Sequence, residues 1–282
     1  MEKRPPQIHH RLVDQTEFVS DSLKAILAQV RASNETNISG NLDRDLSIVV
    51  DRLNSDDLVT IRFATGGEAH NLAVCYLDGI ADHQLLNEYV LKAFIWNQED
   101  APLVKHEKVR SWEKIFTSLV AGKAVVFREG SQEAYVFESE KWKNRAIAEP
   151  QTEGVIRGPR DGFVESLNIN LSLIRRRLRT PDFRILKLKI GRYTQTEVAI
   201  CYLEGLADPS MVSELLHRLK KIQIDGILES GYLEQFIEDN HFSPFPQIHY
   251  TERPDRAVAN LLEGRVAIIT DGTPFVLIVP AA

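Results

Sequence analysis

One short stretch occurs twice in the chain, and its repetition constrains the fold more than any other feature. Residues 74–82 read V-C-Y-L-D-G-I-A-D, and residues 200–208 read I-C-Y-L-E-G-L-A-D. Each copy is an apolar run that ends in an acid and a glycine, followed by small residues and an aspartate. This pattern is typical of a strand that leads into a helix. We therefore predict two structural units that share one plan.

The similarity extends well beyond this stretch and sets the predicted fold class. The ungapped match of Leu46–Leu53 with Leu171–Leu178 is followed by a match of Leu58–Thr65 with Phe183–Ile190. Near the ends of the copies, Ala121–Phe127 matches Glu263–Ile269, and the turn Glu129-Gly-Ser matches Asp271-Gly-Thr. Each copy reads as a helix, a hairpin, two helices and a second hairpin. The expected fold is α/β (α+β), with two similar lobes that each hold a small mixed or antiparallel four-stranded sheet packed with helices.

The expected domain boundaries follow from the linkers between these copies. Residues 1–40 form an N-terminal helical arm, with helical spacing over 16–32, and lobe 1 spans 41–143. Residues 144–162, rich in glycine and proline, form a linker, and lobe 2 spans 163–282 with an inserted loop at 223–250. The sequence stops directly after a strand-like run at 274–280, so we interpret it as the soluble part of a longer protein.

Composition indicates a soluble globular protein, with 43% hydrophobic and 26% charged residues. A net charge of −6 argues against binding to a nucleic-acid backbone. The sequence holds no run of about 18 apolar residues that could span a membrane, and taken alone it reads as cytoplasmic. Its two cysteines, Cys75 and Cys201, occupy the same position in the two copies. We interpret them as small buried apolar residues in a reducing compartment.

Few side chains form a pattern that indicates chemistry. The repeated acids Asp78, Asp82, Glu204 and Asp208 fall where turns and helix caps need polar groups. The eight histidines lack ligand spacing, and no phosphate-binding loop or nucleophile elbow is present. We predict neither a metal site nor a cofactor, and a cytosolic enzyme on a duplicated fold is the least favoured alternative.

A basic cluster in the second copy is more specific. It comprises Arg175, Arg176, Arg177 and Arg179, and the matching residues of the first copy include Val50 and Asp51, so the shared fold does not require it. Such a cluster could bind an anion, a lipid headgroup or an acidic partner. The alternative is a solvated helix face whose arginines form ion pairs with Glu165 and other acids.

Several ordered stretches resemble a known family. They are Phe163–Arg179, Cys201–Asp208, Glu229–Tyr232, Phe242–Pro246, Thr251–Asp255, Leu262–Ile268 and Asp271–Phe275. In this order they are similar to the A subunits of GerA-type spore germinant receptors from endospore-forming bacteria. The similarity covers nearly the whole chain.

The resemblance implies a soluble N-terminal domain, with two lobes similar to a bilobed substrate-binding protein, that precedes an integral membrane domain. It implies a place in the spore inner membrane, with this domain on the cytoplasmic, spore-core side. The implied partners are the receptor B and C subunits, other A subunits and a small nutrient germinant such as an amino acid, a sugar or an ion.

Our functional hypothesis is a non-enzymatic domain that senses nutrients and transduces the signal that triggers germination, with the lobes moving about residues 144–162. The alternative is a scaffold for subunit assembly that has no small-molecule site. The expected ligand or partner surface comprises Glu165, Asn168, Arg175, Arg176, Arg177, Arg179, Phe242, Pro244 and Pro246.

Overall fold

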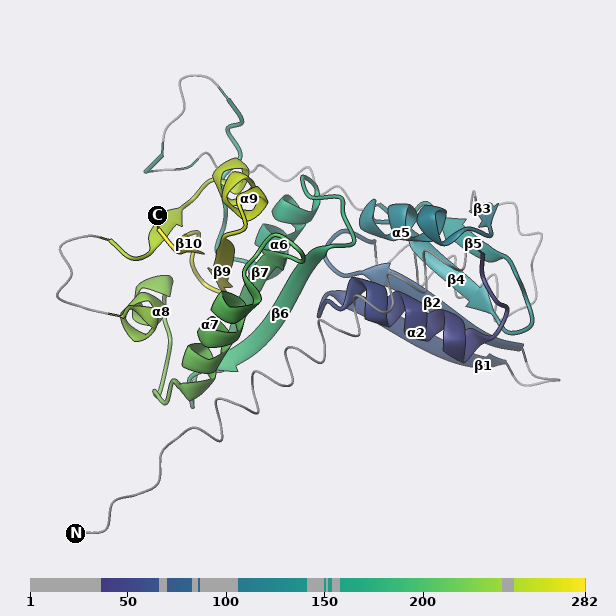
Figure 1. Cartoon of the computed structure of the whole chain (residues 1–282), viewed down its shortest axis with the longest axis horizontal. Helices are drawn as coiled ribbons and strands as arrows, with labels where there is room; N and C mark the ends of the chain where they lie inside the picture. Colours follow the sequence, from purple (N-terminus) through teal and green to yellow (C-terminus); the bar gives the residue numbers. More distant parts are fainter. Residues whose placement is uncertain are drawn as a thin grey trace, which may run out of the picture. The chain divides into compact units, whose positions relative to one another are not determined.

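The computed structural model describes residues 37–65, 70–82, 86, 106–140, 150, 152–153, 158–239 and 246–281 (Figure 1). The predicted helix at 16–32 lies outside these residues. In the first copy, the helix predicted directly after the first hairpin also lies outside them, apart from Asp82 and Leu86. Two compact units are present. We call Leu27–Ile147 with Leu171–Arg184 the N-terminal unit, and Ala148–Asn170 with Ile185–Ala282, together with Met1–Ile26, the C-terminal unit.

In the part of the chain that the structure describes, the N-terminal unit is a five-stranded sheet with two helices on one face. Its elements are α2 (Leu42–Leu53), β1 (Leu58–Thr65), β2 (His70–Leu77), β3 (His106–Val109), α5 (Trp112–Val120), β4 (Ala124–Arg128) and β5 (Ala134–Phe137). The strand order is β1-β2-β4-β5-β3, with antiparallel neighbours. Leu46 and Val49 from α2 and Ile115 from α5 pack on Cys75 and Val125, so both helices bury their apolar sides against one face of the sheet.

The C-terminal unit repeats this strand plan, and four helices are described with it. Its elements are α6 (Leu167–Arg175), β6 (Phe183–Ile190), β7 (Thr196–Leu203), α7 (Pro209–Lys221), α8 (Ser230–Ile237), β8 (His249–Thr251), α9 (Pro254–Leu262), β9 (Val266–Thr270) and β10 (Val276–Val279). The strand order is β6-β7-β9-β10-β8. Val212 and Leu215 from α7 and Leu233 from α8 pack on Val198 and Ile268. The side chain of Asp208 caps α7 by accepting from the Ser210 amide at 2.8 Å.

The two strand orders correspond position by position, so the predicted α/β fold of two similar sheets with helices is confirmed. The prediction of four strands in each sheet was one short. The fifth strands are β3 and β8, whose four and three residues are mostly exposed and carry no apolar alternation. The lobe boundaries at 41–143 and 163–282 remain a prediction, and the compact units differ from them at Leu171–Arg184.

The repeated stretch forms the same tight turn in both units. Gly79 and Gly205, which follow the ends of β2 and β7, both have a φ of +83°. A second glycine ends the helix that packs beside each turn, Gly122 after α5 and Gly264 after α9, with φ of +92° and +84°. A Cβ atom would lie 3.0 Å from the Ile80 oxygen at Gly122 and 2.6 Å from the Leu206 oxygen at Gly264. Gly122 and Gly264 therefore reflect close backbone packing, whereas Gly79 and Gly205 supply the positive φ of the turn.

A second repeated contact fixes the start of the first helix of each unit. Glu129, in the turn between β4 and β5, accepts from the Leu42 amide of α2 at 3.0 Å. Asp271, in the turn between β9 and β10, accepts from the Leu167 amide of α6 at 2.9 Å. The following glycines, Gly130 and Gly272, donate their amides to the chain just before each helix, at 2.8 and 2.7 Å. Each turn thus satisfies helix amides that have no partner inside the helix.

Substitution of Gly264 by alanine should destabilise the C-terminal unit more than the same change at Gly205. Both positions carry a positive φ, but a Cβ at Gly205 has nothing within 4 Å, whereas one at Gly264 meets backbone. We expect the difference in unfolding free energy to be about 1–3 kcal/mol, measured by urea denaturation. Equal losses would show that the approach to Leu206 is not tight.

The two thiols should be inaccessible in the folded chain. Cys75 and Cys201 are free and buried, as predicted. Burial raises the pKa of Cys75 to about 12, so almost none of it is thiolate near neutral pH. Ellman's reagent should react slowly with the native protein and label both thiols after unfolding. Rapid labelling of Cys75 in the native state would contradict this packing.

Candidate functional site

The arginine segment at the end of α6 is held by the loop that follows α2. Arg175 is buried, with 1% of its side chain exposed, and forms a two-point ion pair with Asp57. Its Nε lies 2.8 Å from Asp57 Oδ2, and its Nη2 lies 2.8 Å from Asp57 Oδ1 and 3.0 Å from Ser55 Oγ. The guanidinium stacks on Phe183, with Cζ 4.6 Å from the ring centroid. These residues all belong to the N-terminal unit.

Asp57 links this pair to the repeated turn. Its carboxylate also accepts from Ser55 Oγ at 2.6 Å, and its backbone oxygen accepts from the Asp78 amide at 2.7 Å. Burying two charges costs several kcal/mol each, which the two-point geometry and the extra hydrogen bonds offset. Within the described residues, Arg175 Nη1 is buried and has no hydrogen-bond partner. The pair is therefore costly to break and sensitive to local displacement.

A second ion pair lies in the same unit as the first, with the roles of the copies exchanged. Arg52 of α2 pairs with Asp182 at 2.7 Å, and Asp182 matches Asp57 in the alignment of the repeats. Thr180 donates to Asp182 at 3.0 Å, as Ser55 does to Asp57. The chain from α6 to the start of β6 is thus tied to the end of α2.

Arg184 completes this network at the C-terminus of α2. Its Nη1 donates to the carbonyl oxygens of Arg52, at 2.9 Å, and Leu53, and to that of Pro181 at 2.8 Å. A cation at the last carbonyls of a helix satisfies acceptors that have no partner inside the helix and favours the helix dipole.

The other predicted site residues have more ordinary surroundings. Arg177 donates to the Leu173 oxygen at 2.9 Å, and the exposed Arg179 donates to the Arg176 oxygen at 3.3 Å. Arg176 is half-buried. The guanidiniums therefore do not converge on one surface.

The remaining predicted residues are exposed or lie outside the described part of the chain. Glu165 and Asn168 are exposed in the C-terminal unit, and Asn168 Oδ1 lies 3.5 Å from Lys187 Nζ. Pro246 is exposed, whereas Phe242 and Pro244 lie outside the described residues. The partner of Arg175 is Asp57 rather than Glu165, so the residue that sequence reasoning missed is Asp57. The one sequence feature that could have indicated Asp57 is the aspartate that precedes the first strand in each copy.

This arrangement positions backbone and helices and shows no reactive constellation. Within the described residues, no group of three or more histidine, cysteine or acidic side chains could hold a metal ion. In that same part of the chain, no helix is long and apolar enough to cross a membrane. The network can lock the end of α6 in place, and a change that broke the Arg175–Asp57 pair would release it.

Comparison with known proteins identifies the family. Residues 46–282 match the family model described as the Bacillus/Clostridium GerA spore germination protein. The chain belongs to the GerA family. The resemblance predicted from the sequence is therefore confirmed.

Individual relatives agree with this assignment. The chain is 41% identical to spore germination protein KA of Bacillus subtilis over 241 residues, which cover 80% of this chain and 44% of that protein. It is 37% identical to the uncharacterized membrane protein YfkQ of Bacillus subtilis, covering 92% of this chain and 53% of that protein. This GerA-family chain spans about half the length of the curated relatives it matches.

A solved structure matches the fold as well. It is the crystal structure of the N-terminal domain of the A subunit of the Bacillus megaterium spore germinant receptor GerK3. The TM-score is 0.68 at 33% identity, and the match covers 88% of this chain and 97% of that one.

Removing one partner of the buried pair should cost far more stability than removing one partner of an exposed pair. Arg175→Met should lower the unfolding free energy by about 3–5 kcal/mol, because Asp57 is left buried and uncompensated. The matched control is Arg62→Met, since Arg62 pairs with Asp43 at 2.6 Å with side chains 57% and 79% exposed. That change should cost about 0–1 kcal/mol.

A double-mutant cycle with Asp57→Asn isolates the interaction, with unfolding followed by urea denaturation. We expect a coupling free energy of at least about 1 kcal/mol between Arg175 and Asp57. Strictly additive losses would show that the two side chains do not depend on each other.

Proposed function

We propose that this chain is the nutrient-sensing and signal-transducing domain of a membrane-embedded spore germinant receptor that triggers germination. Support comes from its membership of the GerA family and from its similarity to the N-terminal domain of the A subunit of the GerK3 receptor. In this proposal the domain acts by changing conformation and makes or breaks no covalent bond. Its partners are the receptor B and C subunits and other A subunits. The full-length protein lies in the spore inner membrane, with this domain on the core side.

The observation that carries the transducing role is the anchoring of α6 at both ends. Its first residue, Leu167, is held by Asp271 in the C-terminal unit. Its last residue, Arg175, is held by Asp57 in the N-terminal unit. In this proposal, a shift of one anchor is passed along the helix to the other. We propose that a nutrient or a neighbouring subunit acts on one unit and that α6 carries the change to the other.

Spores whose only copy of the encoding gene carries Arg175→Lys test this route. Lysine keeps the charge but loses the two-point geometry, so α6 is held less firmly. We expect germination in response to nutrient to slow by about tenfold, as dipicolinate release would show, at equal receptor levels by immunoblot. The control is Arg62→Lys, which alters only an exposed ion pair. A normal response in the Arg175→Lys spores would contradict a role for α6.

Co-purification of the B and C subunits separates transduction from scaffolding. A transducing domain predicts that the Arg175→Lys receptor still assembles and fails to respond. Loss of the B and C subunits from the variant complex would instead favour the assembly scaffold.

A further inference from the structure

Helix α8 buries one side in the C-terminal unit and leaves apolar side chains exposed on the other. Leu233 and Ile237 are buried in the core of that unit, where α8 packs beside α7 (Figure 1). Leu228, Tyr232 and Phe236 are 69%, 37% and 45% exposed. Residues four apart lie on the same side of a helix, so Tyr232 and Phe236 share one side, and Leu228 lies one turn before them. We call these three exposed residues the α8 stripe.

The shared fold does not require the α8 stripe. Helix α8 lies in the stretch by which the second copy is longer than the first. Single exposed apolar residues are common on protein surfaces and need no explanation. Apolar residues repeated at a spacing of four along one exposed side are instead the anchors by which helices bind their partners.

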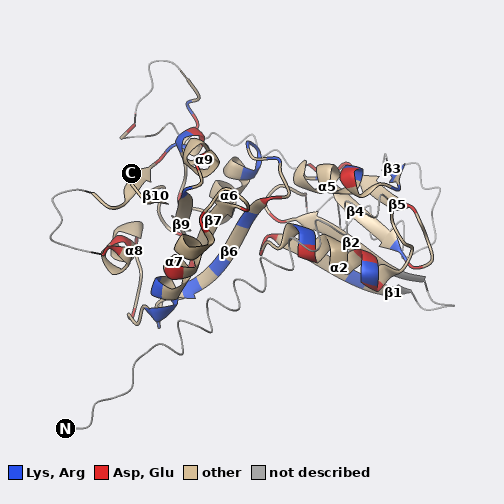
Figure 2. Ribbon diagram, in the orientation of Figure 1, with Lys and Arg blue, Asp and Glu red and all other residues tan. Residues whose placement is uncertain are grey.

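The chain around the α8 stripe is acidic. Residues 222–252 contain six acids and no lysine or arginine, so this stretch alone carries as much negative charge as the net −6 of the whole chain. Figure 2 shows acidic residues and no basic ones on α8. Glu229 directly precedes the helix and Asp239 follows its C-cap, so acids lie beyond both ends of it. A partner that covers the stripe therefore meets negative charge.

Some of these acids lie close enough to repel one another. Burial raises the pKa of the Glu234 carboxyl, and the carboxylates of Glu238 and Glu229 raise it further. Like charges four residues apart on a helix, as in Glu234 and Glu238, destabilise it. Arg218 of α7 pairs with Asp239 at 2.5 Å, which offsets one of the negative charges. A cationic partner would relieve the repulsion further.

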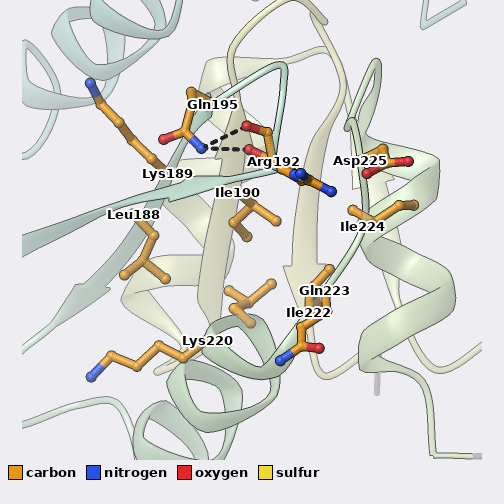
Figure 3. Close-up of a pocket in the computed structure, with 12 residues that line it drawn as sticks. Leu188, Lys189, Ile190, Arg192, Gln195, Lys220, Ile222, Gln223, Ile224 and Asp225 are labelled. Carbon is orange, nitrogen blue, oxygen red and sulfur yellow. Dashed lines mark hydrogen bonds between the residues drawn. The ribbon is translucent and has the colours of Figure 1, made fainter.

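Helix α8 is fixed in place before any partner binds. At its C-terminal end, Arg218 of α7 donates to the Ile237 oxygen at 2.5 Å. Before its start, the Arg192 amide donates to the Ile224 oxygen at 2.9 Å, which joins the segment between α7 and α8 to the turn between β6 and β7 (Figure 3). A preformed surface binds more tightly, because little conformational freedom is lost on binding.

We propose that the α8 stripe is a docking surface for a basic amphipathic helix of a partner protein. Apolar side chains of the partner cover Tyr232 and Phe236, and its lysines or arginines face the acids of residues 222–252. Charge complementarity favours this occupant over a second copy of the chain, because a symmetric dimer would place one acidic stretch against another. This inference goes beyond the receptor role proposed above, because the binding is measured on the 282-residue chain itself.

Fluorescence anisotropy with labelled peptides tests the proposal. The probe is a helical peptide of about 14 leucines and lysines, with the leucines on one side. One control peptide has glutamate in place of each lysine, and a second has the lysines and leucines in scrambled order. We expect one probe to bind per chain, at least about tenfold more tightly than either control peptide, and more weakly at high salt.

Substitutions in the stripe separate this surface from general attraction to an acidic protein. Phe236→Ser and Tyr232→Ser should each weaken binding of the probe by about tenfold. Tyr193→Ser is the matched control and should leave binding unchanged, since Tyr193 is 72% exposed in the same unit but lies in the turn between β6 and β7. Unchanged urea midpoints would show that all three variants fold.

Several outcomes would overturn the proposal. A dimer of the chain alone, seen by sedimentation velocity and dissociated by Phe236→Ser, would assign the stripe to a second copy. Binding to phosphatidylcholine vesicles that Phe236→Ser abolishes would assign it to a membrane surface. Failure of the probe to bind, equal binding of the control peptides, or equal losses in the Phe236→Ser and Tyr193→Ser variants would show that the stripe does not recognise a basic amphipathic helix.

Discussion

A carboxylate in the turn between two strands fixes the first helix of each unit, and the rest of the architecture depends on that contact. The amides at the start of a helix have no partner inside the helix, and they carry partial positive charge. Glu129 and Asp271 meet this need for α2 and α6, while the adjacent glycines bond to the chain just before each helix. The helix is thereby held in register on the sheet whose apolar face it covers. Because one turn serves both the sheet and the helix, the glycine and the acid recur together in both copies.

The two units differ at positions where one copy carries an interaction that the shared fold does not require. Val50 in α2 is 47% exposed, and the matching residue in α6 is Arg175, which is buried against Asp57. A buried ion pair is an expensive way to hold a helix, since apolar side chains of similar volume often serve as well or better. Its value lies in geometric specificity, which suits a helix proposed to carry a signal. The second copy is also longer than the first between its two hairpins, and α8 lies in that longer stretch.

Sequence reasoning predicted the features that short-range patterns encode. Apolar spacing predicted the repeated strand and the helices α2, α5 and α7. Cap and turn chemistry predicted the turn and the Asp208 cap, and the apolar surroundings of the cysteines predicted their burial. The short exposed strands β3 and β8 carry no such pattern, so they were missed. The partner of Arg175 was also missed, because it lies 118 residues away and nothing local distinguishes Asp57 from the neighbouring Asp56.

Amide hydrogen exchange tests most directly whether each unit depends on its own copy of the turn-to-helix contact. Removing a cap typically costs about 0.5–2 kcal/mol, enough to accelerate local exchange several-fold. Glu129→Ala should speed exchange in the first turn of α2 and leave α6 unchanged, and Asp271→Ala should do the reverse. Unchanged exchange in the helix that each acid contacts, or equal acceleration of both helices by either variant, would contradict the account.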